Sequence, residues 1–309
     1  MPRFNFTIKQ LRYIEAAGRL GSIAHAASEL NISQSSITSA IDGLENEVGF
    51  DLFIRTRAKG LQTTSGGEQV LTLIRRFIQQ SRHFEADVRS VGGMASGTVR
   101  IAIYGTSAPS FLPVILDNVT KKFPQLSVKI MEGTLPTVMD FVSEGEADLA
   151  FTYEMATDAR HRFYPLLVAP PYALFSANDP LGQRASITME ELSTHPMILL
   201  DLPVARYFFT SLYTARNLKP KIAHTTQSSE IARALVSAGF GHTLLNMRPP
   251  GYEKDDTRFR AVPISNCDNA PKFGMATIEG TRQPEVVQTF MKNCLEMRDD
   301  GAFEPLIIQ

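Results

Sequence analysis

The sequence predicts a multidomain α+β protein with an N-terminal winged helix-turn-helix, a long linker helix and a C-terminal α/β region. Three patterns predict this class. Apolar residues recur at helical spacing in the first 65 residues, a heptad pattern follows residue 66, and strand-like and helix-like segments alternate after residue 97. A length of 309 residues fits two or three domains, and the 43% apolar content is that of a globular protein.

A helical segment that begins after Thr7, two further amphipathic helices and a hairpin account for residues 1–65. Ser22 and Ser33 stand where N-caps are expected, and Gly49 stands where a helix would end in the left-handed conformation. About three residues separate the two helices, which is the spacing of a helix-turn-helix. Two extended segments at 52–55 and 61–64 enclose a basic tip. This arrangement predicts a wing.

The heptad pattern at residues 66–92 predicts a coiled-coil linker helix that joins two chains. Apolar residues at spacings of four and three, interrupted by Ser81, form the expected dimer seam. Its members are Val70, Ile74, Phe77, Phe84 and Val88, with Val91 at the end. The glycine-rich residues 93–97 predict a hinge.

The remaining residues, 98–309, alternate between strand and helix patterns and predict a mostly parallel sheet with helices on both faces. They form one domain or two lobes. In the two-lobed interpretation, lobe I comprises about 98–164 and 270–309, and lobe II about 165–269.

Several segments resemble LysR-type transcriptional regulators. They are residues 21–38 (Gly-Ser-Ile-Ala-His-Ala-Ala-Ser-Glu-Leu-Asn-Ile-Ser-Gln-Ser-Ser-Ile-Thr), 44–49, 52–55 and 64–67, with 145–150 and 236–241 as weaker matches. The resemblance covers the whole chain and implies a winged helix-turn-helix, a linker helix and an α/β effector domain. That domain resembles two-lobed type 2 periplasmic binding proteins. One departure is that Ser39 and Asp42 stand where the family usually carries a basic residue.

The resemblance implies binding to double-stranded DNA. The N-terminal residues of a recognition helix reach base edges in the major groove, whereas basic wing residues contact phosphates. The candidate DNA contacts are Ser33, Gln34, Ser35, Ser36, Thr38, Ser39, Arg55, Arg57, Lys59 and Thr64. The alternative interpretation is that the hydroxyl-rich helix start is only a cap and the basic run only a solvated face.

A ligand in such an α/β domain binds at the carboxyl ends of strands, where helix N-termini converge. The candidate effector-binding residues are Thr106, Ser107, Gly133, Thr134, Leu202, Pro203, Gln227, Ser228 and Asn246. The family's inducer sites lie at the matching positions. Hydroxyls and free N–H groups suit a small carboxylate, although each of these residues is equally explained as a helix cap.

The sequence thus predicts a regulator that binds an inverted-repeat promoter site as a dimer or tetramer and changes transcription in response to a small-molecule effector. Its expected partners are DNA, the effector, further copies of the chain and RNA polymerase. Activation and repression both remain open. The alternatives are a solute-binding-type sensor protein without a transcriptional role, an enzyme that uses the α/β domain, and a repressor without a ligand.

We expect no enzyme activity, metal or cofactor, because the sequence contains none of the usual hydrolase, nucleotide-binding or metalloprotease motifs. The lack of an export signal or a long apolar run predicts a cytoplasmic protein with no membrane partner. Cys267 and Cys294 are either a redox switch or two ordinary thiols.

Overall fold

The structure is a computed structural model that describes residues 6–56, 60–90, 97–248, 251–252, 257–267 and 270–308. The chain separates into two compact units, an N-terminal one of residues 1–91 with the short segment 143–146, and a C-terminal one of residues 92–142 and 147–309. The predicted wing residues Arg57 and Lys59, together with hinge residues 93–96, lie outside the described residues.

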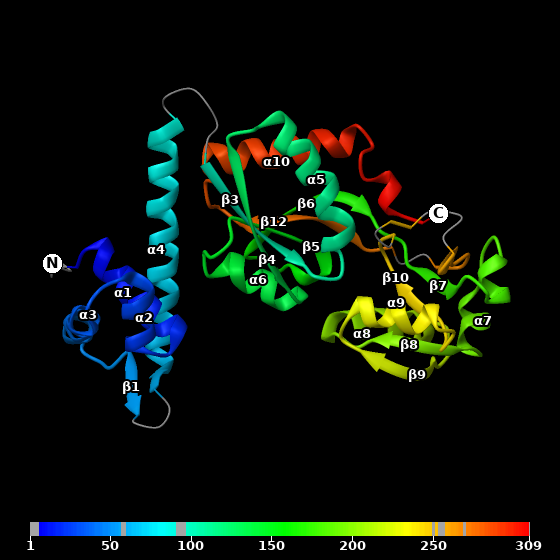
Figure 1. Ribbon diagram of the computed structural model, residues 1–309, viewed down its shortest axis with the longest axis horizontal. Helices are drawn as coiled ribbons and strands as arrows, with labels where there is room; N and C mark the ends of the chain where they lie inside the picture. The colour runs from blue at the N-terminus through cyan, green and yellow to red at the C-terminus, as the bar shows by residue number, and fades with distance from the viewer. Residues whose placement is uncertain are drawn as a thin grey trace. The chain divides into compact units, whose positions relative to one another are not determined.

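The N-terminal unit has the predicted order of helices and hairpin (Figure 1). Its elements are α1 (Ile8–Leu20), α2 (Ile23–Leu30), α3 (Gln34–Val48), β1 (Phe53–Thr56), β2 (Gly60–Thr63) and α4 (Ser65–Ser90). Ser22 and Ser33 are the N-caps of α2 and α3, and Gly49 ends α3 with φ of 81°, as predicted. β1 and β2 pair antiparallel, with Phe53 opposite Thr63.

The core of this unit lies between α1, α2, α3 and one face of α4. Ile14, Ile37 and Ile41 are fully buried there. From α4, Leu71 joins the same cluster. Gly67 on the first turn of α4 permits close packing, because a Cβ at this position would lie 2.1 Å from the carbonyl oxygen of Leu52.

The first subdomain of the C-terminal unit, built from both ends of that unit, forms a five-stranded sheet in the order β4-β3-β5-β12-β6. Its elements are β3 (Gly97–Tyr104), α5 (Ala108–Lys122), β4 (Leu126–Gly133), α6 (Leu135–Ser143), β5 (Leu149–Tyr153), η1 (Glu154–Ala156), β6 (His161–Val168), β12 (Lys272–Ile278), α10 (Glu285–Asp299) and η3 (Glu304–Leu306). The bulky residues of β3 pack with α5 and α10, whereas Ala102 packs with α6. This alternation places helices on both faces of the sheet.

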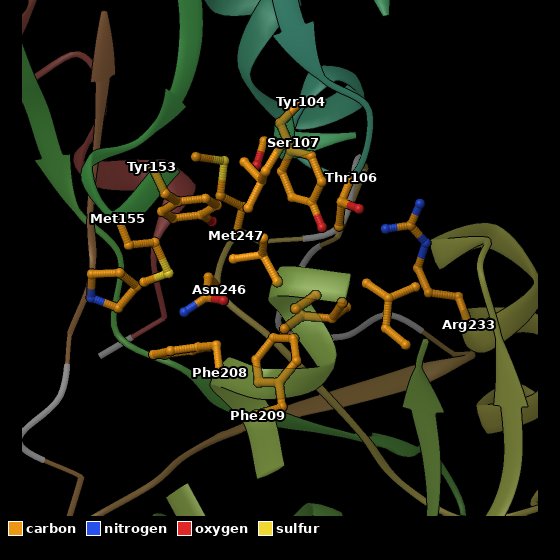
Figure 2. Close-up of a pocket in the computed structure, with 16 residues that line it drawn as sticks. Tyr104, Thr106, Ser107, Tyr153, Met155, Phe208, Phe209, Arg233, Asn246 and Met247 are labelled. Carbon is orange, nitrogen blue, oxygen red and sulfur yellow. The ribbon is translucent and has the colours of Figure 1, made fainter. Parts of the chain in front are cut away.

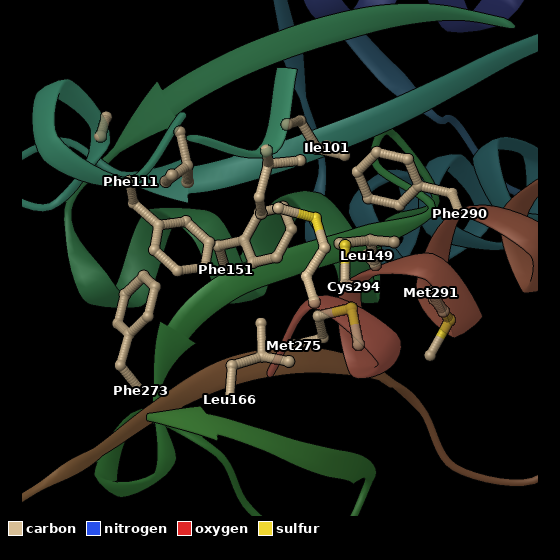
Figure 3. Packing of buried hydrophobic residues seen from close by; sticks show 14 of the residues in the cluster. Ile101, Phe111, Leu149, Phe151, Leu166, Phe273, Met275, Phe290, Met291 and Cys294 are labelled. Atoms are coloured by element: carbon tan, nitrogen blue, oxygen red, sulfur yellow. The ribbon is translucent and has the colours of Figure 1, made fainter. Parts of the chain in front are cut away.

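Aromatic rings fill the larger of the two cores in this subdomain. The ring of Phe111 lies 5.0 Å from that of Phe151 and 4.9 Å from that of Phe273, measured between centroids. Phe290 and Cys294 of α10 close the cluster on the other side (Figure 3).

The second subdomain lies between β6 and β12 in the chain. Its elements are β7 (Tyr172–Ser176), η2 (Pro180–Gln183), α7 (Met189–Ser193), β8 (Pro196–Leu200), α8 (Pro203–Thr214), β9 (Lys221–Thr226), α9 (Ser229–Ser237), β10 (Thr243–Leu245) and β11 (Phe259–Pro263). β8 and β9 pair in parallel, and β10, β7 and β11 form an antiparallel set. α8 packs on one side of β8, against Leu199, and α9 on the other, against Ile198.

The expectation of a mostly parallel sheet is wrong for both subdomains. β12 runs antiparallel to β5 and β6, because the chain returns from the second subdomain directly into the sheet without a crossover helix. β6 also extends to Val168, where it pairs with Lys272, so this strand crosses the expected lobe boundary at residue 165.

Candidate functional site

The start of α3 is a cluster of hydroxyl groups. The Ser33 hydroxyl accepts the N–H of Ser36 at 3.2 Å and lies 2.8 Å from the hydroxyls of both Ser35 and Ser36. Ser33 is therefore the N-cap of α3, in agreement with the alternative interpretation that the hydroxyl-rich helix start is a cap. Gln34, Ser35 and Ser36 are exposed beside it, so their side chains are accessible to a partner.

The next turns of α3 separate a packing face from an outer face. Ile37 and Ile41 are fully buried, whereas Ser39 and Asp42 are exposed and Thr38 is half-buried. The outer face is therefore continuous from Gln34 to Asp42.

Arg55 of the wing forms an ion pair with a residue of this outer face. The guanidinium of Arg55 on β1 donates to the carboxylate of Asp42 on α3, and both side chains are about half exposed. An exposed ion pair of this kind contributes only about 0.2–1 kcal/mol, so a phosphate can compete for the guanidinium. Asp42 therefore weakens the positive potential that Arg55 would otherwise present.

Thr64 has a structural role at the start of α4. Its hydroxyl donates to the carbonyl oxygen of Asp51 at 2.8 Å and accepts the N–H of Gly67 at 2.9 Å. Both bonds fix the junction between the wing and the helix, so capping accounts for this residue.

The predicted dimer seam divides into a buried and an exposed part. Ile74 is only 5% exposed and packs in the core of its own unit, with Val70 against the same core. The prediction is therefore wrong for Ile74, because α1 covers the face of α4 to which it belongs. Phe77, Phe84 and Val88 are 47%, 69% and 56% exposed.

A cavity lies in the C-terminal unit, with walls from both subdomains (Figure 2). Of the predicted effector residues, it brings together Thr106, Ser107 and Asn246. Thr106 and Ser107 occupy the corner between β3 and α5, and Asn246 follows β10. The Asn246 amide donates to the carbonyl oxygen of Ala169 at 2.8 Å, which fixes the two crossing segments to each other.

Ser107 is not a helix cap of the usual kind. It stands at the N-cap of α5, but its side chain makes no capping bond and interacts instead with the Tyr153 hydroxyl. Thr106 likewise interacts with Tyr104. Burial raises the pKa of both tyrosines, so each is a neutral phenol that presents its ring to the cavity.

A second hollow shares Tyr104 and Thr106 with the cavity. It contains five more of the predicted residues, namely Gly133, Thr134, Leu202, Gln227 and Ser228. Thr134 and Ser228 use their hydroxyls to cap α6 and α9. Glu132 and Glu230 also border this outer hollow, whereas Pro203 lines neither space.

The family described as LysR substrate binding domain matches residues 92–299, and the family described as bacterial regulatory helix-turn-helix protein, lysR family, matches residues 8–68. The chain belongs to the LysR family of transcriptional regulators. This assignment confirms the expected fold and the expectation that the protein is a regulator and not an enzyme.

Relatives of the LysR family resemble the chain over almost its full length. The HTH-type transcriptional regulator CysB of Burkholderia cenocepacia is 27% identical over 293 residues, which cover 92% of each chain. The crystal structure of HinK from Pseudomonas aeruginosa is 27% identical, covers 95% of this chain and 99% of that one, and superimposes with a TM-score of 0.60. CbnR, solved with its target DNA, is 18% identical and shares the fold, with a TM-score of 0.66 and coverage of 95% and 100%.

Sequence reasoning missed most of the wall of the cavity in this LysR-type chain. The missed residues are Tyr104, Leu135, Tyr153, Met155, Leu200, Val204, Ala205, Phe208, Phe209, Arg233, Leu245, Met247 and Pro271. Most are apolar, and an apolar residue in a strand or helix is first explained as core. The sequence offered one indication for Arg233, because this cation stands next to Ala232 and three residues before Val236 on the apolar side of α9.

Two further titratable groups of the regulator, Cys294 and His242, are buried in the protein interior. Cys294 is fully buried, and burial raises the pKa of its thiol to about 12, so it is not a reactive thiolate at neutral pH. His242 is 1% exposed, and burial lowers the pKa of its imidazole to about 4. No group of three or more potential metal ligands occurs within the described ranges. Among the helices of those ranges, none combines the length and apolar character that a membrane crossing requires.

Proposed function

We propose that this LysR-type regulator binds an inverted-repeat promoter site as a dimer or tetramer and changes transcription when a small-molecule effector, a carboxylate, occupies the cavity between its two subdomains. One observation carries the proposal. The same chain combines an exposed recognition-helix face with a cavity in which Thr106, Ser107 and Asn246 meet. Neither a solute-binding sensor nor a ligand-free repressor needs both features.

On the DNA side, we assign base contacts to Gln34, Ser35, Ser36, Thr38 and Ser39. Glutamine bonds adenine through two groups, and hydroxyls serve several bases. We assign phosphate contacts to Arg55, Arg57 and Lys59, after Arg55 exchanges Asp42 for a phosphate.

The dimer contact is assigned to the exposed apolar side of α4. Leu73, which is 63% exposed, precedes Phe77 by four residues and takes the place of Ile74 in the seam. Phe84 and Val88 continue the same side. A symmetric pair of these helices would place two recognition helices on the two halves of an inverted repeat.

The cavity supplies the control of transcription. A ligand that contacts both subdomains favours one arrangement over another only if it binds that arrangement more tightly. The change would reach the promoter through the linker helix and RNA polymerase.

DNA footprinting tests the proposal. The wild-type protein is expected to protect two related half-sites, and the Gln34→Ala variant to lose about 1–3 kcal/mol of discrimination at particular base pairs. Protection of a single half-site, or Gln34→Ala binding with unchanged specificity, would contradict it.

A further inference from the structure

The cavity between the subdomains has an apolar wall with a single charged group. Four of its sixteen lining residues, namely Thr106, Ser107, Arg233 and Asn246, carry polar side chains other than tyrosine. The rest are aliphatic, sulfur-containing or aromatic. Tyr153, Met155, Phe208 and Phe209 gather at one side of the cavity, as Figure 2 shows.

The neutral polar groups already interact with other groups of the protein. Ser107 interacts with Tyr153 and Thr106 with Tyr104, and the Asn246 amide donates a hydrogen bond to a backbone carbonyl oxygen. A ligand that offered only hydroxyl groups to this cavity would have to replace these interactions. It would also leave its polar groups against the aromatic wall, which costs free energy.

Arg233 differs from the other polar residues. Its side chain is only 7% exposed, and its ion-pair partner Glu230 is 74% exposed and one turn earlier on α9. A guanidinium carries five N–H donors, more than one carboxylate can accept. In Figure 2 the guanidinium of Arg233 extends toward the Thr106 corner of the cavity.

The outer hollow has a different charge. Glu132 and Glu230 border it, and Thr134 and Ser228 there serve as helix caps. The carboxylate of Glu132 disfavours an anion in the outer hollow, whereas Arg233, paired with Glu230, is the one cation among the described residues that line the cavity.

We propose that the effector of this regulator is an aromatic monocarboxylate. Its carboxylate is bound by Arg233 beside the Thr106–Ser107 corner, and its ring lies among Tyr153, Met155 and Phe208. This inference rests on the proposed function, because it takes the cavity as the effector site. The lining is mostly apolar with a few polar groups, which is the character of small-molecule sites.

A short dicarboxylate fits this site poorly. Its second charge would face the aromatic side, where no second cation is among the described lining residues. Burial of an unpaired carboxylate is far more costly than burial of a ring. The ratio of the affinities for an aromatic monocarboxylate and a short dicarboxylate therefore tests the proposal directly.

Calorimetric titration of the full-length protein tests it with defined probes. The acids are benzoate, phenylacetate, 3-phenylpropionate and cinnamate, each compared with its uncharged amide, and succinate is the dicarboxylate. We expect at least one aromatic acid to bind, with its amide about 10- to 100-fold weaker, because the amide loses a charge-assisted hydrogen bond. Tighter binding of succinate than of every aromatic acid, or binding of none of the acids, would overturn the proposal.

Variants of Arg233 identify the anchor. Arg233→Gln should abolish the preference for the acid over its amide, and Arg233→Met gives a second test if the glutamine variant unfolds. Both variants should fold, since the carboxylate they leave behind, that of Glu230, is solvated. The matched control is Arg206→Gln, which removes an exposed cation of α8 that does not line the cavity and should leave the preference unchanged. If Arg233→Gln and Arg233→Met keep the preference, Arg233 is not the anchor and the proposal fails.

A cavity-filling variant separates this proposal from the proposed function. Ala205 lines the cavity, so Ala205→Phe should abolish binding of the aromatic acid. Binding that survives in a folded Ala205→Phe protein would refute the cavity as effector site and both proposals with it. If Ala205→Phe instead abolishes binding of succinate while no aromatic acid binds, the site stands and the aromatic class is refuted.

Discussion

Two positions on α4, one exposed and one buried, should separate dimerisation from folding. Phe84 is 69% exposed, whereas Ile74 is 5% exposed and belongs to the core of its own unit. We expect Phe84→Ala to weaken the dimer without loss of fold, and Ile74→Ala to lower the stability of the fold.

The exposed part of Phe84 sets the size of the first effect. A phenylalanine side chain offers roughly 150–250 Å² for burial, so about 100–170 Å² remains available to a partner. At about 25 cal/mol per Å² this corresponds to roughly 3–4 kcal/mol per side chain if it is fully covered. Because buried area converts only partly into affinity, we expect a loss of at least about 2 kcal/mol per dimer, or roughly thirtyfold in Kd.

Sedimentation equilibrium over a concentration series measures the dimer constant, and thermal unfolding of the same samples measures the fold. Ile74→Ala should instead cost about 2–5 kcal/mol of unfolding free energy, as expected for a truncated core residue. The assignment of the seam would be refuted if Phe84→Ala left the dimer constant unchanged while the protein remained folded.

Two further predictions concern a buried histidine and the wing. The pKa of His242 is lowered to about 4, whereas the unfolded chain binds this proton below about 6.5, so stability should fall by up to about 3 kcal/mol as the pH drops from 6.5 to 4. His242→Gln should flatten this part of the pH profile of urea unfolding, with the exposed His224→Gln as control, and an unchanged profile would contradict the assignment. Asp42→Asn should release Arg55, raise the affinity for non-specific DNA about two- to fivefold and steepen its salt dependence. Asp117→Asn is the control of equal charge, and equal affinities of the two variants across a salt series would count against the competition between Asp42 and phosphate.

Local signals in the sequence were sufficient for the N-terminal unit. The caps Ser22 and Ser33 and the end at Gly49 depend on hydrogen bonds within a few residues, so the residue type alone predicts them. The heptad pattern predicted where α4 lies in the sequence, but it did not predict which of two adjacent apolar residues faces the core. Leu73 and Ile74 are both apolar, and only the packing of α1 determines which of them is buried.

The fold and the site of the C-terminal unit depend on contacts between residues that are far apart in the chain. The antiparallel direction of β12 follows from a return between subdomains, which no local pattern marks. The corner at Ser107 was predicted from the order of strand and helix, yet the choice between cap and ligand site depended on Tyr153, 46 positions further along the chain. Arg233 was overlooked because a cation on a helix is usually solvated, and its burial arises from tertiary packing.

The central claim is that occupation of the cavity changes how the regulator binds its promoter. The most direct measurement is DNA footprinting of wild-type and Ala205→Phe proteins, with and without the aromatic acid that binds most tightly. The account predicts that the acid changes the footprint or the affinity of the wild-type protein, while the Ala205→Phe protein binds DNA normally and does not respond. An identical footprint and affinity for the wild-type protein with and without saturating acid would contradict it.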